Sequence, residues 1–393
     1  MQEIGERAQE LFEELVEIRR DFHMHPEVSG KEYRTAKQIE KHLDALGIEH
    51  TRIADTGVVG IIQGKKAGIG KVIGMRADID ALPIQEVKKR DYHSLNDGVM
   101  HACGHDMHAT ILLGAAKILK ERQEDFSGVI KLFFQPAEEA VGGAKRMIAA
   151  GCMENPKVDH VIGLHVEPHV DTGKIEMKYG VLTAITDKLL ITVKGKSGHA
   201  AVPQLAIDPI AIAAQIVTAL QMVVSRAVGP LDSAVLTIGS IHGGTAPNII
   251  PDQVEMTGTL RTLSWETRSK AEKLMKDLSS SIAESFGASV DFELRAGYIG
   301  VVNDREVTDV IKGLASDLLG EENIGWVEFP SLGGEDFAYF AQAVPSSFYH
   351  LGCGNEAKGT RVSLHNKGFD ADEDCIPIGV SLQVESALAL MKK

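Results

Sequence analysis

The sequence contains little cysteine and no excess of positive charge. Only four of its 393 residues are cysteine, and they are widely spaced, which excludes a disulfide-stabilised scaffold. Lysine and arginine (41) are outnumbered by aspartate and glutamate (55), so the net charge is −14. Because nucleic acids and anionic membranes attract basic surfaces, this balance argues against either as the main partner.

Long apolar runs are also missing. No window approaches the roughly 18 apolar residues that a membrane-spanning helix needs, and residues 1–20 lack the apolar core of a signal peptide. With 44% hydrophobic and 24% charged residues, the composition is that of an ordinary globular protein. We therefore expect a cytoplasmic protein without membrane contacts, and at roughly 150 residues per domain its length suggests two or three domains.

Several common catalytic motifs are absent. Gly195-Lys196-Ser197 lacks the upstream glycine of a phosphate-binding loop, because residue 190 is leucine. The sequence has no G-x-S-x-G nucleophile elbow and no H-E-x-x-H zinc motif. Gly68-Ile69-Gly70 joins two predicted strands and opens no helix, so a dinucleotide site is not supported.

The apolar pattern predicts two domains, one inserted into the other. Strand-like runs alternate with helical segments at both ends of the chain, as in an α/β fold with a largely parallel sheet. The middle of the chain follows the ferredoxin-like order βαββαβ. We predict one α/β domain from residues 1–183 and 297–393, and an inserted domain at 184–296. The expected strands are 58–63, 71–76, 129–134, 158–166, 187–194, 234–241, 253–262, 289–294 and 347–351; the expected helices are 9–48 (two helices), 110–121, 144–150, 208–226, 265–286, 307–319 and 376–392.

Histidine, by contrast, is plentiful: the sequence has fifteen, and four of them lie between residues 93 and 108. This cluster contains Met100-His101-Ala102-Cys103-Gly104-His105-Asp106-Met107-His108. Cysteine and histidine are preferred ligands of zinc-like ions, and Cys103-Gly104-His105 can direct both side chains at one ion. The alternative is a surface histidine-rich loop with a buried structural cysteine.

Two further groups of polar residues follow predicted buried strands. Glu138 and Glu139 come just after the strand at 129–134, where open α/β sheets bind their ligands. Adjacent side chains point in different directions, so one could bind a metal while the other faces a bound water. Alternatively, both acidic residues merely begin a helix. His165 ends the next strand, and the three features (residues 101–108, the glutamate pair and His165) would converge in space because they lie at successive strand ends. His365 lies in a loop far along the chain and is a weak candidate by itself.

These segments resemble the M20 family of metallopeptidases and amidohydrolases. The closest likeness is to its aminoacylase-like branch, which hydrolyses hippurate, N-acetyl-amino acids and indoleacetyl-amino acids. The matching segments span nearly the whole chain in the family's order. They are Gly74-Met75-Arg76-Ala77-Asp78-Ile79-Asp80-Ala81-Leu82-Pro83, residues 101–108, 135–139 and 164–168, Gly198-His199-Ala200-Ala201, residues 242–251 and 258–262, Gly334-Glu335-Asp336-Phe337, and residues 365–370.

The resemblance implies a zinc-peptidase-like catalytic domain, an inserted lid and dimerisation domain, and two divalent metal ions per chain. It implies that Glu138 is the general base. The implied metal ligands are Cys103, His105, Glu139, His165 and His365. The implied lid residues are His199 and Asn248, which would stabilise the oxyanion, with His199 reaching the partner protomer's site, and Arg261, which would bind the substrate carboxylate.

The sequence departs from the peptidase branch of this family in two places. Peptidases of the family carry His-x-Asp where this chain has Asp78-Ile79-Asp80, and an acidic bridging ligand near where Cys103 and His105 lie here, so the ligand set is shifted. Asp78 and Asp80 then either support the ligands or simply cap a strand end. A cysteine thiolate favours softer ions such as zinc, whereas this branch is often supported by manganese, cobalt or nickel. His101 and His108 receive no role.

The expected activity is hydrolysis of the amide that joins an acyl group to an L-amino acid in a small-molecule substrate. A metal-activated water would attack the amide, with Glu138 as the base. The alternative on the same scaffold is a dipeptidase or aminopeptidase. A non-catalytic metal-binding protein is a third possibility, but a storage site needs no base beside its ligand, which argues against it. We expect a homodimer formed through the lid domain.

Overall fold

The computed structural model describes residues 2–140 and 142–392, and their contacts divide the chain into two compact units. The first unit comprises Met1–Leu182, Val301–Phe329 and Asp336–Lys393, and the second comprises Thr183–Gly300 and Pro330–Glu335. Each unit is considered by itself below.

The first unit is built on an eight-stranded sheet with the order β1-β2-β4-β3-β5-β16-β6-β15. The central strands β4, β3, β5 and β16 are parallel to one another, whereas β1, β2 and the pairing of β16 with β6 are antiparallel. The predicted parallel sheet is therefore the centre of a mixed sheet. Its strands are β1 (Glu49–Ile53), β2 (Gly57–Gln63), β3 (Val72–Asp78), β4 (Val129–Gln135), β5 (His160–Asp171), β6 (Ile175–Met177), β15 (Ile324–Trp326) and β16 (Ser346–Gly354).

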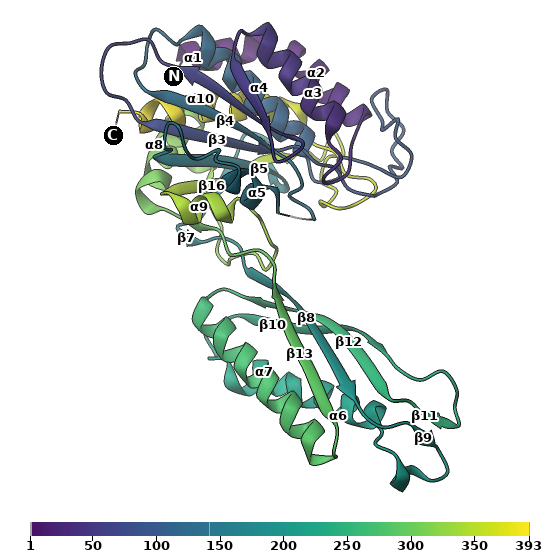
Figure 1. The fold of residues 1–393 in the computed structure, drawn as a ribbon. Helices are drawn as coiled ribbons and strands as arrows, with labels where there is room; N and C mark the ends of the chain where they lie inside the picture. Colours follow the sequence, from purple (N-terminus) through teal and green to yellow (C-terminus); the bar gives the residue numbers. More distant parts are fainter. Residues whose placement is uncertain (1, 141, 393) are drawn as a thin grey trace. The chain divides into compact units, whose positions relative to one another are not determined.

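Helices cover both faces of this sheet (Figure 1). Helices α4 and α10 pack against each other and against β3 and β5, and α1 and α2 pack on them in turn. On β4, Leu132 belongs to the core shared with α4 and α10, whereas the next residue, Phe133, stacks on Phe340 of α9. This alternation is what a strand buried on both faces requires. The helices are α1 (Gln2–Glu10), α2 (Phe12–Met24), α3 (Tyr33–Ala45), α4 (His105–Glu121), α5 (Gly143–Ala149), α8 (Arg305–Leu319), α9 (Ala338–Ala343) and α10 (Ile376–Leu390); a small ribbon pairs β7 (Gly180–Val181) with β14 (Val302–Asn303).

The carboxyl ends of the parallel strands meet at one edge of the sheet. Asp78 on β3 is paired with Gln135 on β4, and His165 on β5 is paired with His350 on β16. The loops that follow these strands must therefore leave the sheet side by side. The functional residues of the first unit are gathered at this edge.

The second unit is a ferredoxin-like βαββαβ fold. Its four main strands form an antiparallel sheet with the order β10-β12-β8-β13. Helix α6 begins at Pro209, and the Asp208 side chain accepts hydrogen bonds from the first free backbone N–H groups, as a helix N-cap does. The elements are β8 (Ile185–Lys194), β9 (Gly198–His199), α6 (Pro209–Met222), β10 (Ala234–His242), β11 (Ile249–Ile250), β12 (Gln253–Thr262), α7 (Trp265–Ser285) and β13 (Ser289–Ala296).

Helix α6 corrects one expectation from the sequence. Together with the π-helical turn Val223–Ala227 it forms a segment, Pro209–Ala227, that is long and apolar enough to cross a membrane by length and composition alone. Residues such as Ile212, Ile216 and Leu220 instead fill the core of the second unit. The apolar-run criterion missed the segment because glutamine, threonine, serine and arginine interrupt it.

Candidate metal centre

The structure brings all five predicted metal ligands together at the carboxyl edge of the first unit's sheet. They form two groups of three whose ligand atoms lie within 4.8 Å of one another, and Cys103 belongs to both. The first group is Cys103, His105 and His165, and the second is Cys103, Glu139 and His365. The Cys103 sulfur lies 3.4 Å from Nε2 of His165 and 3.3 Å from Nε2 of His365. The residues of these two groups would hold two divalent ions.

Gly104 makes the close spacing of Cys103 and His105 possible. Its φ is +81°, in the left-handed region that glycine tolerates best. A Cβ atom there would lie 2.3 Å from Cγ2 of Val166, so a side chain is excluded by contact as well. Because the chain turns at Gly104, α4 begins directly at His105, five residues before the predicted start at residue 110.

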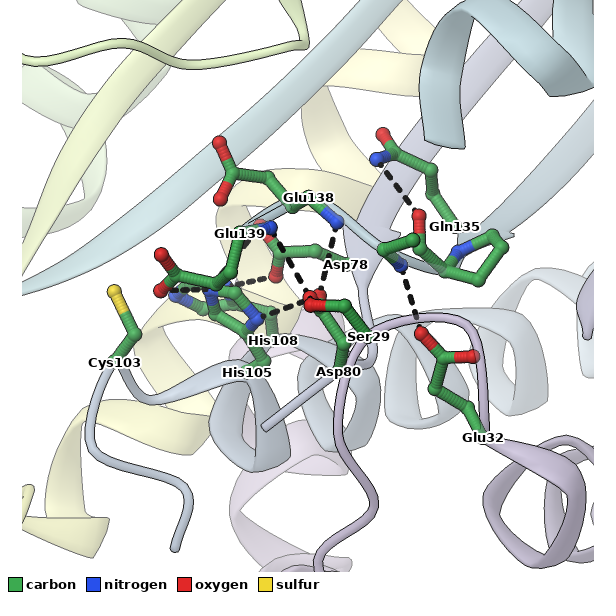
Figure 2. A network of polar contacts seen from close by, with 12 residues as sticks. Ser29, Glu32, Asp78, Asp80, Cys103, His105, His108, Gln135, Glu138 and Glu139 are labelled. Atoms are coloured by element: carbon green, nitrogen blue, oxygen red, sulfur yellow. Dashed lines mark hydrogen bonds and ion pairs between the residues drawn. The ribbon is translucent and has the colours of Figure 1, made fainter. Parts of the chain in front are cut away.

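Asp80 holds the glutamate loop and one of the histidines in place (Figure 2). Its carboxylate accepts hydrogen bonds from the backbone N–H groups of Glu138 at 3.2 Å and Glu139 at 3.1 Å, and from Oγ of Ser29 at 2.6 Å. It also lies 3.2 Å from Nδ1 of His105, which leaves Nε2 of that ring for the ligand group. Burial opposes ionisation of Asp80, but these donors outweigh it, so the pKa of this carboxyl is lowered.

Asp78 supports the site through a different histidine. Its Oδ1 lies 2.5 Å from Nδ1 of His108, and its Oδ2 lies 2.8 Å from a guanidinium nitrogen of Arg76. Nε2 of His108 accepts a hydrogen bond from the backbone N–H of Val166 at 2.8 Å. Both ring nitrogens of His108 are therefore engaged, and this histidine ties α4 to β5. Burial lowers the pKa of His108 to about 4 even with Asp78 beside it.

His101 is the second histidine without a predicted role. It is buried, but its ring is not held by hydrogen bonds to described residues as the ring of His108 is. Neither of its ring nitrogens has a hydrogen-bond partner among the residues that the structure describes. Its ring lies 6.4 Å from that of His23, centroid to centroid. Burial lowers its pKa to about 4, so the ring is neutral near pH 7.

The donors present fit divalent metal ions. Nε2 of His105 is buried and has no hydrogen-bond partner within residues 2–140 and 142–392. Nδ1 of His165 donates to the Val166 carbonyl at 2.7 Å, which leaves its Nε2 lone pair toward Cys103. Oε1 of Glu139 lies 3.0 Å from Nε2 of His365 and 4.0 Å from Nε2 of His105. The site places thiolate, imidazole and carboxylate groups close together, and such a set of ligands binds zinc or a similar ion.

Two non-glycine residues at the site have left-handed backbones. Ala137, just before the glutamate pair, has φ +55°, and His365 has φ +58°. The backbone N–H of Ala137 donates to Glu32 at 2.9 Å, and that of His365 donates to the Ala102 carbonyl at 2.8 Å. Such conformations cost free energy and persist where the surroundings hold them, typically at functional sites.

Glu138 lies outside the two groups that contain Cys103, although its carboxylate comes within 4.8 Å of ligand atoms of His105 and Glu139. Figure 2 shows the Glu139 carboxylate directed toward Cys103, whereas the Glu138 carboxylate points away from Asp80. Oε1 of Glu138 accepts a 3.4 Å hydrogen bond from the backbone N–H of Asp336. The Asp336 carboxylate is fixed in turn by Arg76 at 2.9 Å and by Gln135 at 2.8 and 2.9 Å. Only the family-like segments that contain Arg76 and Asp336 indicated this support before the structure was known.

The other predicted residues belong to the second unit. His199 on β9 is exposed, and its Nδ1 accepts a hydrogen bond from the Ala201 N–H at 3.0 Å. The Asn248 carbonyl accepts from the Ala200 N–H at 3.1 Å, so His199 and Asn248 lie in one small ribbon. Arg261 on β12 donates to the Leu332 carbonyl at 2.6 Å.

Comparison with known proteins assigns the family. Residues 74–389 match the family model described as peptidase family M20/M25/M40. The chain belongs to this family. It is 39% identical over 383 residues to an N-acetyl-L-cysteine deacetylase of Bacillus subtilis, covering 97% of this chain and 89% of that protein. It is 40% identical over 391 residues to thermostable carboxypeptidase 2 of Saccharolobus solfataricus, covering 98% of each chain.

A solved structure agrees. The dinuclear metal-binding peptidase of the M20 family from Bacillus subtilis is 34% identical, with a TM-score of 0.84 that covers 98% of this chain and 99% of that one. The resemblance noticed in the sequence and the α/β fold class are thus confirmed, and the M20 chain is a hydrolase of amide bonds.

Proposed function

We propose that this M20 enzyme hydrolyses the amide bond of N-acyl-L-amino acids. The observation that carries the proposal is the glutamate pair: Glu139 belongs to the ligand group with Cys103 and His365, whereas the neighbouring Glu138 belongs to neither group that contains Cys103 and accepts a hydrogen bond from the Asp336 N–H. A ligand and a base on consecutive residues are what metal-assisted hydrolysis needs. The names of the deacetylase and carboxypeptidase relatives support amides in which the amine belongs to an amino acid.

In the proposed reaction, Glu138 takes a proton from the attacking water as the water oxygen bonds to the amide carbon. It then gives that proton to the leaving nitrogen as the carbon–nitrogen bond breaks, which releases the acid and the free amino acid. Bound divalent ions would lower the pKa of the water and polarise the amide carbonyl. The residues that would hold them are Cys103, His105 and His165 for one ion, and Cys103, Glu139 and His365 for the other.

The shared sulfur and the harder donors are compatible with several divalent ions. A thiolate in both ligand groups favours zinc, and the Glu139 carboxylate also accommodates manganese, cobalt or nickel. In our proposal Arg261 binds the substrate carboxylate, because a guanidinium offers a planar fork of donors, and Asn248 and His199 stabilise the oxyanion. We also propose a cytoplasmic location.

A substrate panel tests the proposal. Protein loaded with zinc, manganese, cobalt or nickel should release amino acids from N-acetyl-amino acids faster than from free dipeptides, because no acidic group is assigned to bind an α-ammonium. The released amine is measured for each substrate, with N-acetyl-amino acid amides as controls that lack the carboxylate. Faster cleavage of free dipeptides would instead favour the dipeptidase or aminopeptidase alternative.

We propose that the second unit is a lid and dimerisation domain that pairs along β10. Strand β10 is an edge of its sheet and carries no charged residue, whereas the opposite edge β13 carries Asp291, Glu293 and Arg295. Charged edges discourage pairing with another chain, and uncharged ones permit it. The exposed face of α6 is also uncharged from Pro209 to Ser225, and Met222 there is 58% exposed.

Complementation between two inactive variants tests whether His199 serves the partner's site. Glu138→Gln and His199→Ala homodimers should each be nearly inactive. If His199 acts on the partner, a mixed dimer contains one complete site and regains activity, whereas action within one chain restores nothing. Activity is measured on co-expressed chains with two different tags, purified through both. An inactive mixed dimer contradicts the proposal.

A further inference from the structure

Arg19 is a buried arginine outside the proposed catalytic machinery. It lies near the end of α2, its side chain is 0% exposed, and its guanidinium meets three carboxylates. Nε donates to Asp106 at 2.8 Å, one terminal nitrogen donates to Asp370 at 3.0 Å, and the other donates to Glu373 at 3.1 Å. Each nitrogen of the fork therefore binds a different carboxylate, one from the start of α4 and two from residues 370–373.

Two of these carboxylates belong to the segments that carry metal ligands. Asp106 directly follows His105 in the first turn of α4. Asp370 closes the loop that begins with His365, and between β16 and residue 373 this part of the chain has neither helix nor strand. At its other end the loop is fastened by the bond from the His365 N–H to the Ala102 carbonyl. Arg19 thus provides a second fastening between the same two segments.

The surrounding groups complete the network. Nδ1 of His23, one helical turn after Arg19, lies 2.7 Å from the Asp106 carboxylate. Asp370 also pairs with Arg90 and accepts a 3.2 Å hydrogen bond from the Tyr92 hydroxyl. The Arg19 guanidinium lies over the Tyr92 ring, 4.9 Å from its centre. Aromatic packing and charge pairing together leave Arg19 little freedom to move.

A buried network of charged groups stabilises a fold less efficiently than apolar packing does. Removing charged groups from water is unfavourable, and apolar residues of similar volume often stabilise a core at least as well. What a buried arginine offers beyond apolar packing is fixed geometry, because its planar donors set the distance between the carboxylates they bind. Here that distance separates the loop of His365 from the start of α4.

We propose that Arg19 is a positioning residue that holds the His365 loop in register with Cys103. This inference rests on the proposed metal centre. Helix α4 is buried almost throughout and keeps its place by packing, so loss of Arg19 should release the His365 loop rather than the helix. The group Cys103, Glu139 and His365 depends on that loop, whereas Cys103, His105 and His165 does not. Loss of Arg19 should therefore weaken binding of the ion held by Cys103, Glu139 and His365 more than binding of the ion held by Cys103, His105 and His165.

Stepwise metal binding tests this selectivity. Metal-free wild type, Arg19→Lys and Asp370→Asn are titrated with Zn²⁺ by calorimetry and chelator competition, without substrate. In both variants we expect one ion to bind as in the wild type and the other to bind about 10- to 100-fold more weakly, the usual cost of losing a residue that supports a ligand. Arg20→Lys is the matched control, because Arg20 is 42% exposed and of these carboxylates binds only Glu373.

Each result of these titrations either supports or contradicts the proposed role of Arg19. Unchanged affinities for both ions in the variants overturn the proposal, and so does an equal loss of both that follows the melting temperature of the metal-free protein. If Arg19→Lys fails to fold, Asp370→Asn decides the question, because it keeps Arg19 and removes only the loop's charge. A wild-type protein that binds two ions but hydrolyses no amide contradicts the proposed function and leaves this inference standing.

Discussion

Glu138→Gln should lower turnover of N-acetyl-amino acids by about 100- to 10,000-fold, the range that general acid–base catalysis contributes. The amide keeps the size of the side chain and can still accept a hydrogen bond from the Asp336 N–H, so the loop should stay in place. It cannot take a proton from water. Because Glu138 lies outside the two groups that share Cys103, the variant should retain the metal content of the wild type.

The measurements are kcat with saturating substrate and metal content by elemental analysis. Glu139→Gln is the matched control on the next residue: it should lose metal as well as activity, because Glu139 belongs to the group with Cys103 and His365. Turnover within a few fold of the wild type in a fully loaded Glu138→Gln protein would contradict the role of Glu138. Loss of metal in that variant would instead make Glu138 a ligand.

The parts of the site that could be predicted from sequence are those whose residues lie close together in the chain. Cys103 and His105 are separated by one glycine, and Glu138 and Glu139 are adjacent at the end of a buried strand. Their convergence with His165 follows from parallel strands whose carboxyl ends share one edge. Family resemblance was needed for His365, which comes from a loop with no periodic pattern.

The supporting residues could not be predicted because their partners are distant in sequence. Arg19 is separated from Asp106 by 87 residues and from Asp370 by 351, and no local pattern links them. For Asp80 the sequence left two roles open, support of the ligands or a strand cap, and did not indicate that it binds the glutamate loop 58 residues away. Strand β1 was missed for a different reason: it is a polar edge strand, Glu49–Ile53, with no fully buried residue to create an apolar signal.

Cys103→Ser should remove both ions and with them almost all hydrolysis. Cys103 is the one residue common to the two ligand groups, so its loss takes a donor from each. A serine hydroxyl is a far weaker ligand than a thiolate, which binds soft divalent ions as a charged donor. Metal content and turnover should therefore fall together. Cys152→Ser is the control: this cysteine is also buried, at 4% exposed, but it belongs to no candidate ligand group among the described residues.

Cys103→Asp should distinguish two effects of losing Cys103: loss of a ligand common to both groups, and loss of sulfur as the ligand atom. A carboxylate offers two oxygens to two ions, so metal binding should return, but with the preference shifted from zinc toward manganese because oxygen donors suit harder ions. The affinity ratio for Zn²⁺ and Mn²⁺, measured by competition, reports this shift directly. If Cys103→Ser keeps both ions, or Cys103→Asp leaves the ratio unchanged, the sulfur is not a shared ligand. Recovery with a changed ratio would show that position 103 sets the choice of metal.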